Sequence, residues 1–134
     1  MSGVAVIIAL LLLDTGVAQF APSENIVAGT VPQGQTLPAL SIETISETDF
    51  AELAPGEWIF AEERVQVTAF AADYEQAHDL IKAVKRACSN KFPSIDGLRE
   101  VAVVPIGGGP GGIHIATNSP SRSFDFRVSY EEPA

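Results

Sequence analysis

The stretch that decides the fold is Arg64-Val65-Gln66-Val67-Thr68-Ala69-Phe70, followed closely by Asp73-Tyr74-Glu75-Gln76-Ala77. The first run alternates polar and apolar residues, which is the period of a strand with one buried face. In the second run, Asp73 can accept a hydrogen bond from a free amide in the first turn of a helix, and Gln76 can reach back as its capping partner. These residues predict a strand that leads directly into a helix.

The predicted helix carries one continuous apolar stripe. Its apolar residues fall at helical spacing: Ala77, Leu80, Ile81, Val84, Ala87 and Cys88. The residues between them are polar and face away: His78, Asp79, Lys82, Lys85 and Arg86. Ser89-Asn90 and Pro93 end the helix. Because Cys88 lies on the apolar stripe, we expect it to pack in the core rather than to react.

Further strands are predicted on both sides of this unit. Residues 26–28 and 37–47 precede it, with Leu40 and Ile42 on one face of the second strand. Residues 98–106 and 113–118 follow it. In the first of these, one face is predicted to hold Leu98, Ala102, Val104 and Ile106. In the last strand, Phe124, Phe126, Val128 and Tyr130 form an apolar face opposite Asp125, Arg127, Ser129 and Glu131.

The beginning of the chain is apolar, since residues 4–13 contain no polar side chain. No basic residue precedes this run, and Asp14 closes it after ten residues, which is too short to span a bilayer. We interpret residues 3–20 as a buried helix interrupted at Gly16. A signal peptide stays open as the alternative, because small residues follow the run.

These elements predict a single α+β domain over residues 1–134. We expect an antiparallel or mixed sheet of about four to six strands, with two helices packed on one face. A chain of 134 residues can bury a core without metal or disulfide staples. The single cysteine excludes an internal disulfide.

The charge of the chain is strongly negative and unevenly distributed. The formal charge is −9, no Lys or Arg precedes Arg64, and acidic residues crowd residues 43–63. Such a surface repels phosphate, so nucleic acid is not expected as a ligand. The acidic segment is either a solvated loop or a wall past which a polyanion slides without binding.

Two segments are predicted to project from the domain, residues 48–63 and 107–112. In the first, Trp58-Ile59-Phe60 either begins the next strand and packs inward or lies on a hairpin that contacts another subunit. The second is the run Gly107-Gly108-Gly109-Pro110-Gly111-Gly112. It lacks the Lys-Ser/Thr of a phosphate loop and leads into a strand, which favours a mobile hairpin tip over a nucleotide site.

Catalytic chemistry is not indicated by the remaining residues. His78 and His114 are the only histidines, and neither has metal-ligand spacing with another His, Cys or carboxylate pair. No Gly-x-Ser-x-Gly motif occurs, and Cys88 is expected to be buried. An enzyme is therefore the least favoured class, and no cofactor or metal is predicted.

Two stretches carry a resemblance to a known family: residues 32–42, which read PQGQTLPALSI, and residues 64–77, which read RVQVTAFAADYEQA. The chain resembles the small tail-completion (tail-terminator) proteins of long-tailed bacteriophages and prophages over roughly Val4 to Glu131. That family combines an "lP" strand, a "vqv…a" strand and a "y.eA..l…v..al" helix.

The resemblance implies a virion protein assembled in the host cytoplasm. It implies a homo-hexameric ring at the head-proximal end of the tail tube, which stops tube polymerisation and joins the head. The implied partners are further copies of the chain, the tail-tube protein and a head–tail connector protein, with DNA only as passing cargo and no membrane. A connector or neck subunit, and a small secreted binding module, remain the alternatives.

We expect a particular set of residues to carry these contacts. The candidates for subunit or tube contact are Phe50, Trp58, Ile59, Phe60, Gly108 and Gly109. The candidates for lumen or rim charge are Glu57, Glu62 and Glu63.

Overall fold

The computed structural model describes residues 2–31, 36–49, 58–109, 112–114 and 119–133. Its elements follow one another as α1 (Ser2–Leu13), α2 (Thr15–Ala18), a 3-10 helix (Ser23–Asn25), β1 (Ile26–Ala28), β2 (Ala39–Asp49), β3 (Trp58–Phe70), α3 (Tyr74–Cys88), β4 (Arg99–Gly108), β5 (Gly112–His114) and β6 (Ser119–Pro133). The predicted α+β class is confirmed.

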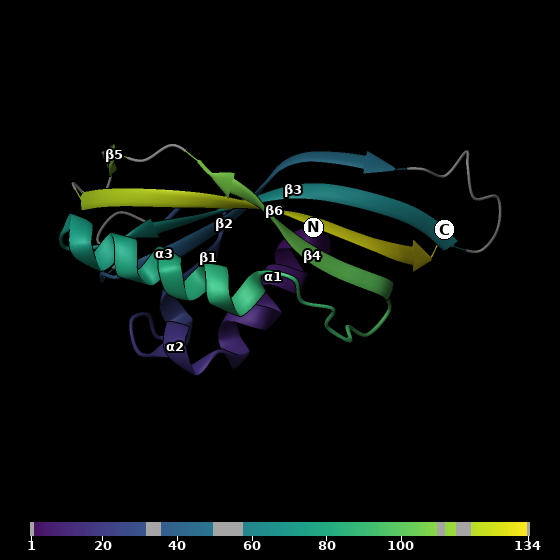
Figure 1. The fold of residues 1–134 in the computed structure, drawn as a ribbon, viewed down its shortest axis with the longest axis horizontal. Coiled ribbons are helices and arrows are strands. Elements are labelled where there is room, and N and C mark those ends of the chain that lie inside the picture. Colours follow the sequence, from purple (N-terminus) through teal and green to yellow (C-terminus); the bar gives the residue numbers. More distant parts are fainter. Residues whose placement is uncertain (1, 32–35, 50–57, 110–111, 115–118, 134) are drawn as a thin grey trace.

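The strands of the described residues form one six-stranded mixed sheet. Their order is β1-β2-β3-β6-β4, and β5 pairs with β6 beside β4. Only β1 and β2 pair in parallel; the other described pairs are antiparallel. Figure 1 shows α1, α2 and α3 together on one face of this sheet, while the ends of β3 and β6 extend beyond them. The expected one-sided helix layer is therefore confirmed, with three α-helices rather than two.

The third helix arises because the first segment breaks at Asp14. The break predicted at Gly16 is therefore wrong. The Asp14 carboxylate accepts a 2.9 Å hydrogen bond from the amide of Val17 and so caps α2. Helix α1 contributes Val4, Val6, Ile7 and Leu11 to the core. The secreted alternative would remove these buried side chains. No helix among the described residues is long and apolar enough to cross a membrane.

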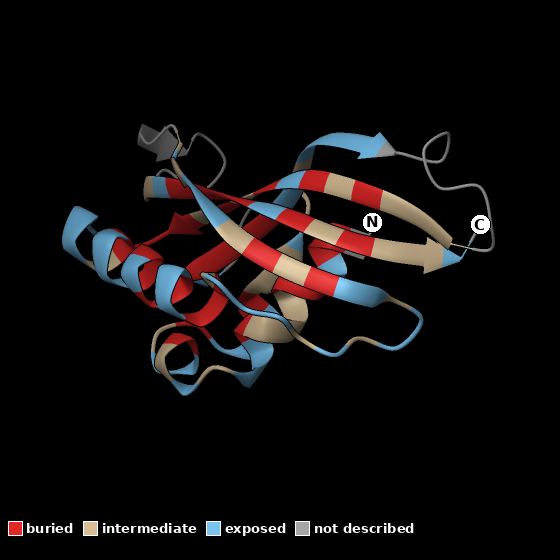
Figure 2. Cartoon of the chain, turned by 45° about the vertical axis from the view of Figure 1, so that its right-hand side comes forward, coloured by how far each residue is buried: buried red, intermediate tan, exposed pale blue. Residues whose placement is uncertain are grey.

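Helix α3 follows its prediction closely. Asp73 Oδ1 accepts from the Gln76 amide at 2.8 Å, and Gln76 Oε1 accepts from the Ala72 amide at 3.0 Å. All six residues of the predicted stripe are buried, together with Ala83. Figure 2 shows the exposed side of α3 facing away from the sheet. The helix packs its apolar stripe against β3 and β6.

The central strands alternate between a core face and a face without helices. On β6 the predicted apolar residues Phe124, Phe126, Val128 and Tyr130 are all buried. They share the core face with Ala61, Val65 and Val67 of β3. The opposite face, here called the helix-free face, carries mostly polar side chains from β2, β3 and β6. This alternation explains why the helices cover one side only.

The face predicted to be shared by Leu98, Ala102, Val104 and Ile106 is divided in the structure, because Leu98 packs against the core while the other three lie on the opposite face. The buried residues are Val101 and Val103, whereas Ala102 and Val104 are half-buried and Ile106 is exposed. Glu100 has a φ of 52°, and the pairing with β6 shifts between Arg99 and Ala102. This bulge shifts the alternation by one residue, which moves the opposite set of side chains to the core.

The predicted extent of the first projecting segment is also corrected. Strand β2 continues to Asp49 and β3 begins at Trp58, so only residues 50–57 lie between them, outside the described residues. In the second segment, Gly107 and Gly108 belong to β4. That these segments project into contact with other proteins stays a prediction.

The β4 correction predicts different costs for two neighbouring valines. Val103→Ala removes packing from a fully buried site, and we expect it to lower the free energy of unfolding by about 2 kcal/mol. Val104→Ala, on the helix-free face, should cost about 1 kcal/mol at most. Urea unfolding of both variants measures the difference. A larger loss for Val104→Ala would contradict the β4 register.

The thiol of Cys88 is buried among the core residues, and burial raises its pKa to about 12 from 9.0. At pH 8 we expect its reaction with a disulfide reagent to be roughly a thousandfold slower in the folded protein than in the unfolded chain, because thiolate is the reactive form. A thiol introduced at exposed Ser94, through Ser94→Cys, serves as the fast-reacting control.

The same pKa difference determines how the contribution of Cys88 to stability changes with pH. The folded chain retains the Cys88 proton to higher pH than the unfolded chain, so this contribution to stability is complete below pH 9 and is lost between about pH 9 and 12. Replacement by Cys88→Ser should flatten the decline in that range. Equal declines in both proteins would rule out this role for Cys88.

Candidate assembly interface

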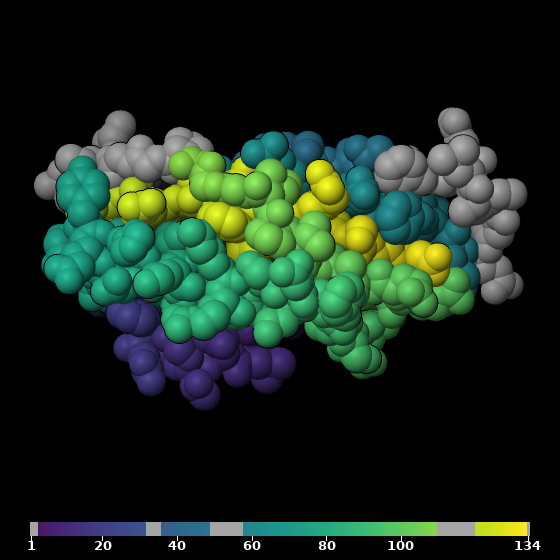
Figure 3. Space-filling view, in the orientation of Figure 1, coloured from purple at the N-terminus to yellow at the C-terminus, as the bar shows by residue number. Residues whose placement is uncertain are grey.

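Three of the candidate contact residues, Trp58, Ile59 and Phe60, lie where the sheet extends past its helices, whereas Gly108 and Gly109 lie beside Phe124 and Ser123 near the other end of β6. Past the helices, β3 residues 58–61 pair with β6 residues 130–133, and Asp49 of β2 pairs with Ala61. We call this region the distal sheet end. In Figure 3, α3 and β4 cover much of the near face, while β3 and β6 emerge at the right-hand side. Phe50 and Glu57 lie outside the described residues.

Trp58 at the distal sheet end is held by a neighbouring cation. The Arg99 guanidinium carbon lies 4.1 Å from the centre of the Trp58 ring. Arg99 also donates to Glu131, with a 2.7 Å contact from Nη2 and a 3.0 Å contact from Nε. The Trp58 ring is therefore oriented from within the subunit and remains half-buried. A fixed, partly exposed aromatic ring is suited to protein contact, because little side-chain entropy remains to be lost.

The next two apolar residues divide between the two faces. Trp58 and Phe60 are two residues apart on β3 and share the helix-free face, whereas Ile59 lies on the same side as Ala61. Both Ile59 and Phe60 are half-buried. These residues begin β3, as the first alternative predicted, but Trp58 and Phe60 do not pack inward as it also predicted. Whether they contact another subunit stays a prediction.

Glu63 is not a lumen or rim charge as predicted, because its side chain is 1 % exposed. Its carboxylate accepts hydrogen bonds from the Gly3 amide at 2.7 Å and the Thr44 hydroxyl at 2.9 Å, and a short one from the Tyr130 hydroxyl. Burial, and then the bond to Glu63, raises the pKa of Tyr130. Glu63 therefore joins the start of α1 to three strands. Glu62, by contrast, is half-exposed on the helix-free face.

The glycines predicted for contact have different surroundings. Gly108 pairs with Phe124 and has open space around its Cα. The Gly109 amide donates to the Ser123 carbonyl at 3.1 Å, and a Cβ there would lie 2.5 Å from Ser123 Oγ and 2.8 Å from Gln66 Nε2. A side chain at position 109 would therefore have to displace the side chains of Ser123 and Gln66. Contact of either residue with a partner remains a prediction.

An ion pair that sequence reasoning missed lies next to Gly109. Asp125 is 3 % exposed and accepts from Arg64 Nε at 2.8 Å and from Gln66 Nε2 at 3.1 Å. Both strands were predicted with these residues on their polar faces. Only the register, in which Gln66 pairs with Asp125, brings them together. Strand alternation alone could have suggested the shared face.

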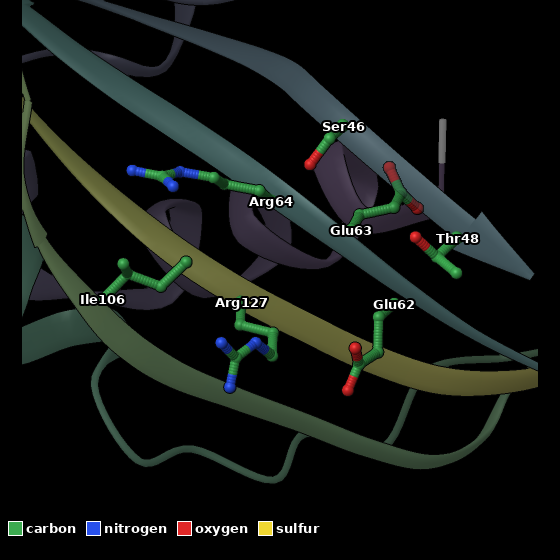
Figure 4. Close-up of a pocket in the computed structure, with 7 residues that line it drawn as sticks. All are labelled: Ser46, Thr48, Glu62, Glu63, Arg64, Ile106 and Arg127. Atoms are coloured by element: carbon green, nitrogen blue, oxygen red, sulfur yellow. The ribbon is translucent and has the colours of Figure 1, made fainter.

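A polar hollow of about 240 Å³ lies on the helix-free face (Figure 4). Its lining includes Ser46, Thr48, Glu62, Arg64 and Arg127. Arg127 pairs across the strands with Arg64 and makes no ion pair with a described residue. Among the described residues no group of three His, Cys, Asp or Glu side chains is arranged to hold a metal. Hydroxyl and charged groups of this kind suit polar contact with another protein.

Comparison with known families decides the assignment. A family model described as "Tail completion protein gp17" matches residues 5–106, which is more than half of the chain. The chain belongs to this family. It is therefore a structural protein of the bacteriophage virion, located in the tail.

The fold of this tail-completion protein occurs in a solved virion structure. A chain from "Virion of native gene transfer agent (GTA) particle" aligns with a TM-score of 0.63 and 16 % identity, covering 98 % of this chain and 99 % of that one. At this identity the similarity establishes the shared fold. No curated protein sequence matches the chain significantly.

The two neighbouring glutamates provide a test of the site. Glu63→Gln weakens a buried acceptor of three hydrogen bonds, and we expect it to lower the free energy of unfolding by about 2 kcal/mol. Glu62→Gln should change stability by less than about 0.5 kcal/mol. Thermal and urea unfolding measure both. Equal stability of the two variants would show that Glu63 does not tie α1 to the sheet.

Proposed function

We propose that this tail-completion protein is a tail terminator. In this proposal it forms a hexameric ring on the head-proximal end of the tail tube, stops tube growth and presents a surface to the head–tail connector protein. The match to the tail-completion family over residues 5–106 carries the proposal. The mechanism is physical and needs no catalytic residue.

The distal sheet end supplies a structural basis for the proposed contacts. It carries Trp58, Ile59 and Phe60 on two faces of β3, beyond the cover of the helices. Aromatic side chains held at a surface are typical anchors of protein interfaces. We assign this region to contact with a neighbouring copy or with the tail-tube protein.

The charge of the protein fits DNA as cargo rather than as a ligand. The chain has 17 acidic and 8 basic residues, and a ring of such subunits would repel phosphate on a passing strand. Of the three glutamates first proposed for the rim, Glu63 is excluded by its burial and Glu62 is retained. Glu57 lies outside the described residues and stays a proposal.

The direct test combines electron microscopy and light scattering of the protein with purified tail-tube protein. We expect tubes capped at one end, and a free ring, where one forms, of about 85 kDa, six times the 14.1 kDa of one chain. Tubes that neither shorten nor acquire a cap would contradict the terminator function. Binding to a portal-side adaptor instead would indicate a connector subunit.

The contact residues are tested by a double variant. Trp58→Ala with Phe60→Ala should reduce the fraction of capped tubes at least tenfold, because both aromatic anchors are lost. Tyr74→Ala removes an exposed aromatic ring at the start of α3, away from the distal sheet end, and should leave capping unchanged. Unfolding curves confirm that both variants remain folded. Normal capping by the double variant would refute the assigned contact.

A further inference from the structure

We propose that the outer edge of β2, over residues 43–49, binds an extended segment of a different protein as an added strand. The proposal begins with the shortness of β1, which pairs only with residues 40–42 of β2. Among the described residues, the following part of β2 pairs with β3 on one side and with no strand on the other. The backbone groups of such an edge can pair with an incoming strand.

The chain leaves the edge of β2 at a defined point. Gly29 has a φ of 87°, its amide donates to the Ile42 carbonyl at 3.0 Å, and its carbonyl accepts a hydrogen bond from the Ser41 hydroxyl. These bonds turn the chain away directly after Ala28. No described strand occupies the position beside Glu43 and Thr44 that a longer β1 would take.

A hollow of about 320 Å³ lies at this position. It is lined by Val4 of α1, Ala28 and Gly29 at the end of β1, Thr30, and residues 42–44 of β2. Val4 and Ile42 give it a buried apolar wall. A strand continuing the line of β1 would place a side chain there. Strand addition combined with a side-chain pocket is a known mode of peptide recognition.

The opposite edge of the sheet is protected, which makes the β2 edge distinctive. On β4, Val103 exchanges two backbone hydrogen bonds with Lys91, at 2.9 and 3.2 Å. Two residues later, Pro105 has no amide hydrogen to offer a partner. On β2 the described residues contain only a bulge between Thr44 and Ser46, and Ile45 at that bulge is 50 % exposed.

The charge of the β2 edge specifies its occupant. Glu43 and Glu47 are both exposed on it. Pairing of two β2 edges would bring the glutamates of both copies close together, which disfavours a second copy. The β4 edge of a second copy is protected as described. The occupant is therefore a segment of another protein in which an aliphatic residue for the hollow alternates with Lys or Arg. The inference rests on the proposed function in one respect, because it assumes that the other protein is a component of the tail.

The test uses a synthetic, end-blocked hexapeptide of alternating lysine and valine as the probe, with NMR of the ¹⁵N-labelled protein. We expect shifts concentrated at residues 28–30 and 42–48. Binding should be at least tenfold tighter than for the same peptide with proline at its central valine, or with glutamate for lysine. Shifts spread over the whole acidic surface, equal binding of the three peptides, or no binding would each overturn the proposal.

A variant that fills the hollow tests its role in peptide binding, and a second variant serves as the matched control. Ala28→Leu places a larger side chain at the mouth of the hollow and should weaken binding of the peptide at least tenfold, while Ala72→Leu, at another exposed alanine, should not. Unchanged binding by a folded Ala28→Leu variant would overturn the use of the hollow.

Peptide binding requires no ring. Absence of tube capping with intact peptide binding would therefore refute the terminator function alone. Tube capping without peptide binding would refute the strand site alone.

Discussion

The ladder of thirteen residue pairs between β3 and β6 is the constraint on which the rest of the structure depends. Antiparallel pairing sets the register and the face of every side chain at once. It places Val65 beside Phe126 on the core face and Gln66 beside Asp125 on the other. A slip of one residue would expose the apolar set and separate Arg64 from its buried partner. The helices can cover only the face that this register makes apolar.

The carboxylate of Glu63 extends this constraint to the start of the chain. A buried charge is costly unless hydrogen-bond donors surround it, and here an amide and two hydroxyls do so. The amide belongs to the first turn of α1, where the helix dipole also favours a negative group. A Cβ at residue 3 would lie 2.8 Å from Glu63 Cδ, so glycine is required for the close approach. Residues 3 and 63 therefore fix the position of α1 together.

The parts of the fold that depend on local pattern were predictable from the sequence. The Asp73 cap, the apolar stripe of α3 and the alternation of β6 all follow from residues near one another in the chain. The orientation of β4 was not predictable, because the left-handed conformation of Glu100 reverses the alternation and no glycine marks it. The break at Asp14 was misplaced because Gly16 was the more obvious helix breaker, although Asp14 has the side chain of a cap.

The candidate site was less predictable than the fold, for a physical reason. Glu63 stands in an acidic run that has the composition of a solvated surface, and its burial depends on partners 19, 60 and 67 residues away. Asp125 likewise requires the register of β3 and β6 before Arg64 and Gln66 can be recognised as its partners. Local sequence identifies charged residues but does not distinguish those that face solvent from those that hold elements together.

The two edges of the sheet differ in a way that bears on the end of a polymer. A sheet with two accessible edges can both accept a strand and offer one, so pairing can propagate from subunit to subunit. In the described part of this chain, Lys91 and Pro105 protect β4, while β2 beyond Ile42 is accessible. Such a subunit can accept one added strand without offering an edge for the next. Under the proposed terminator function, strand pairing with another tail protein would stop at this subunit.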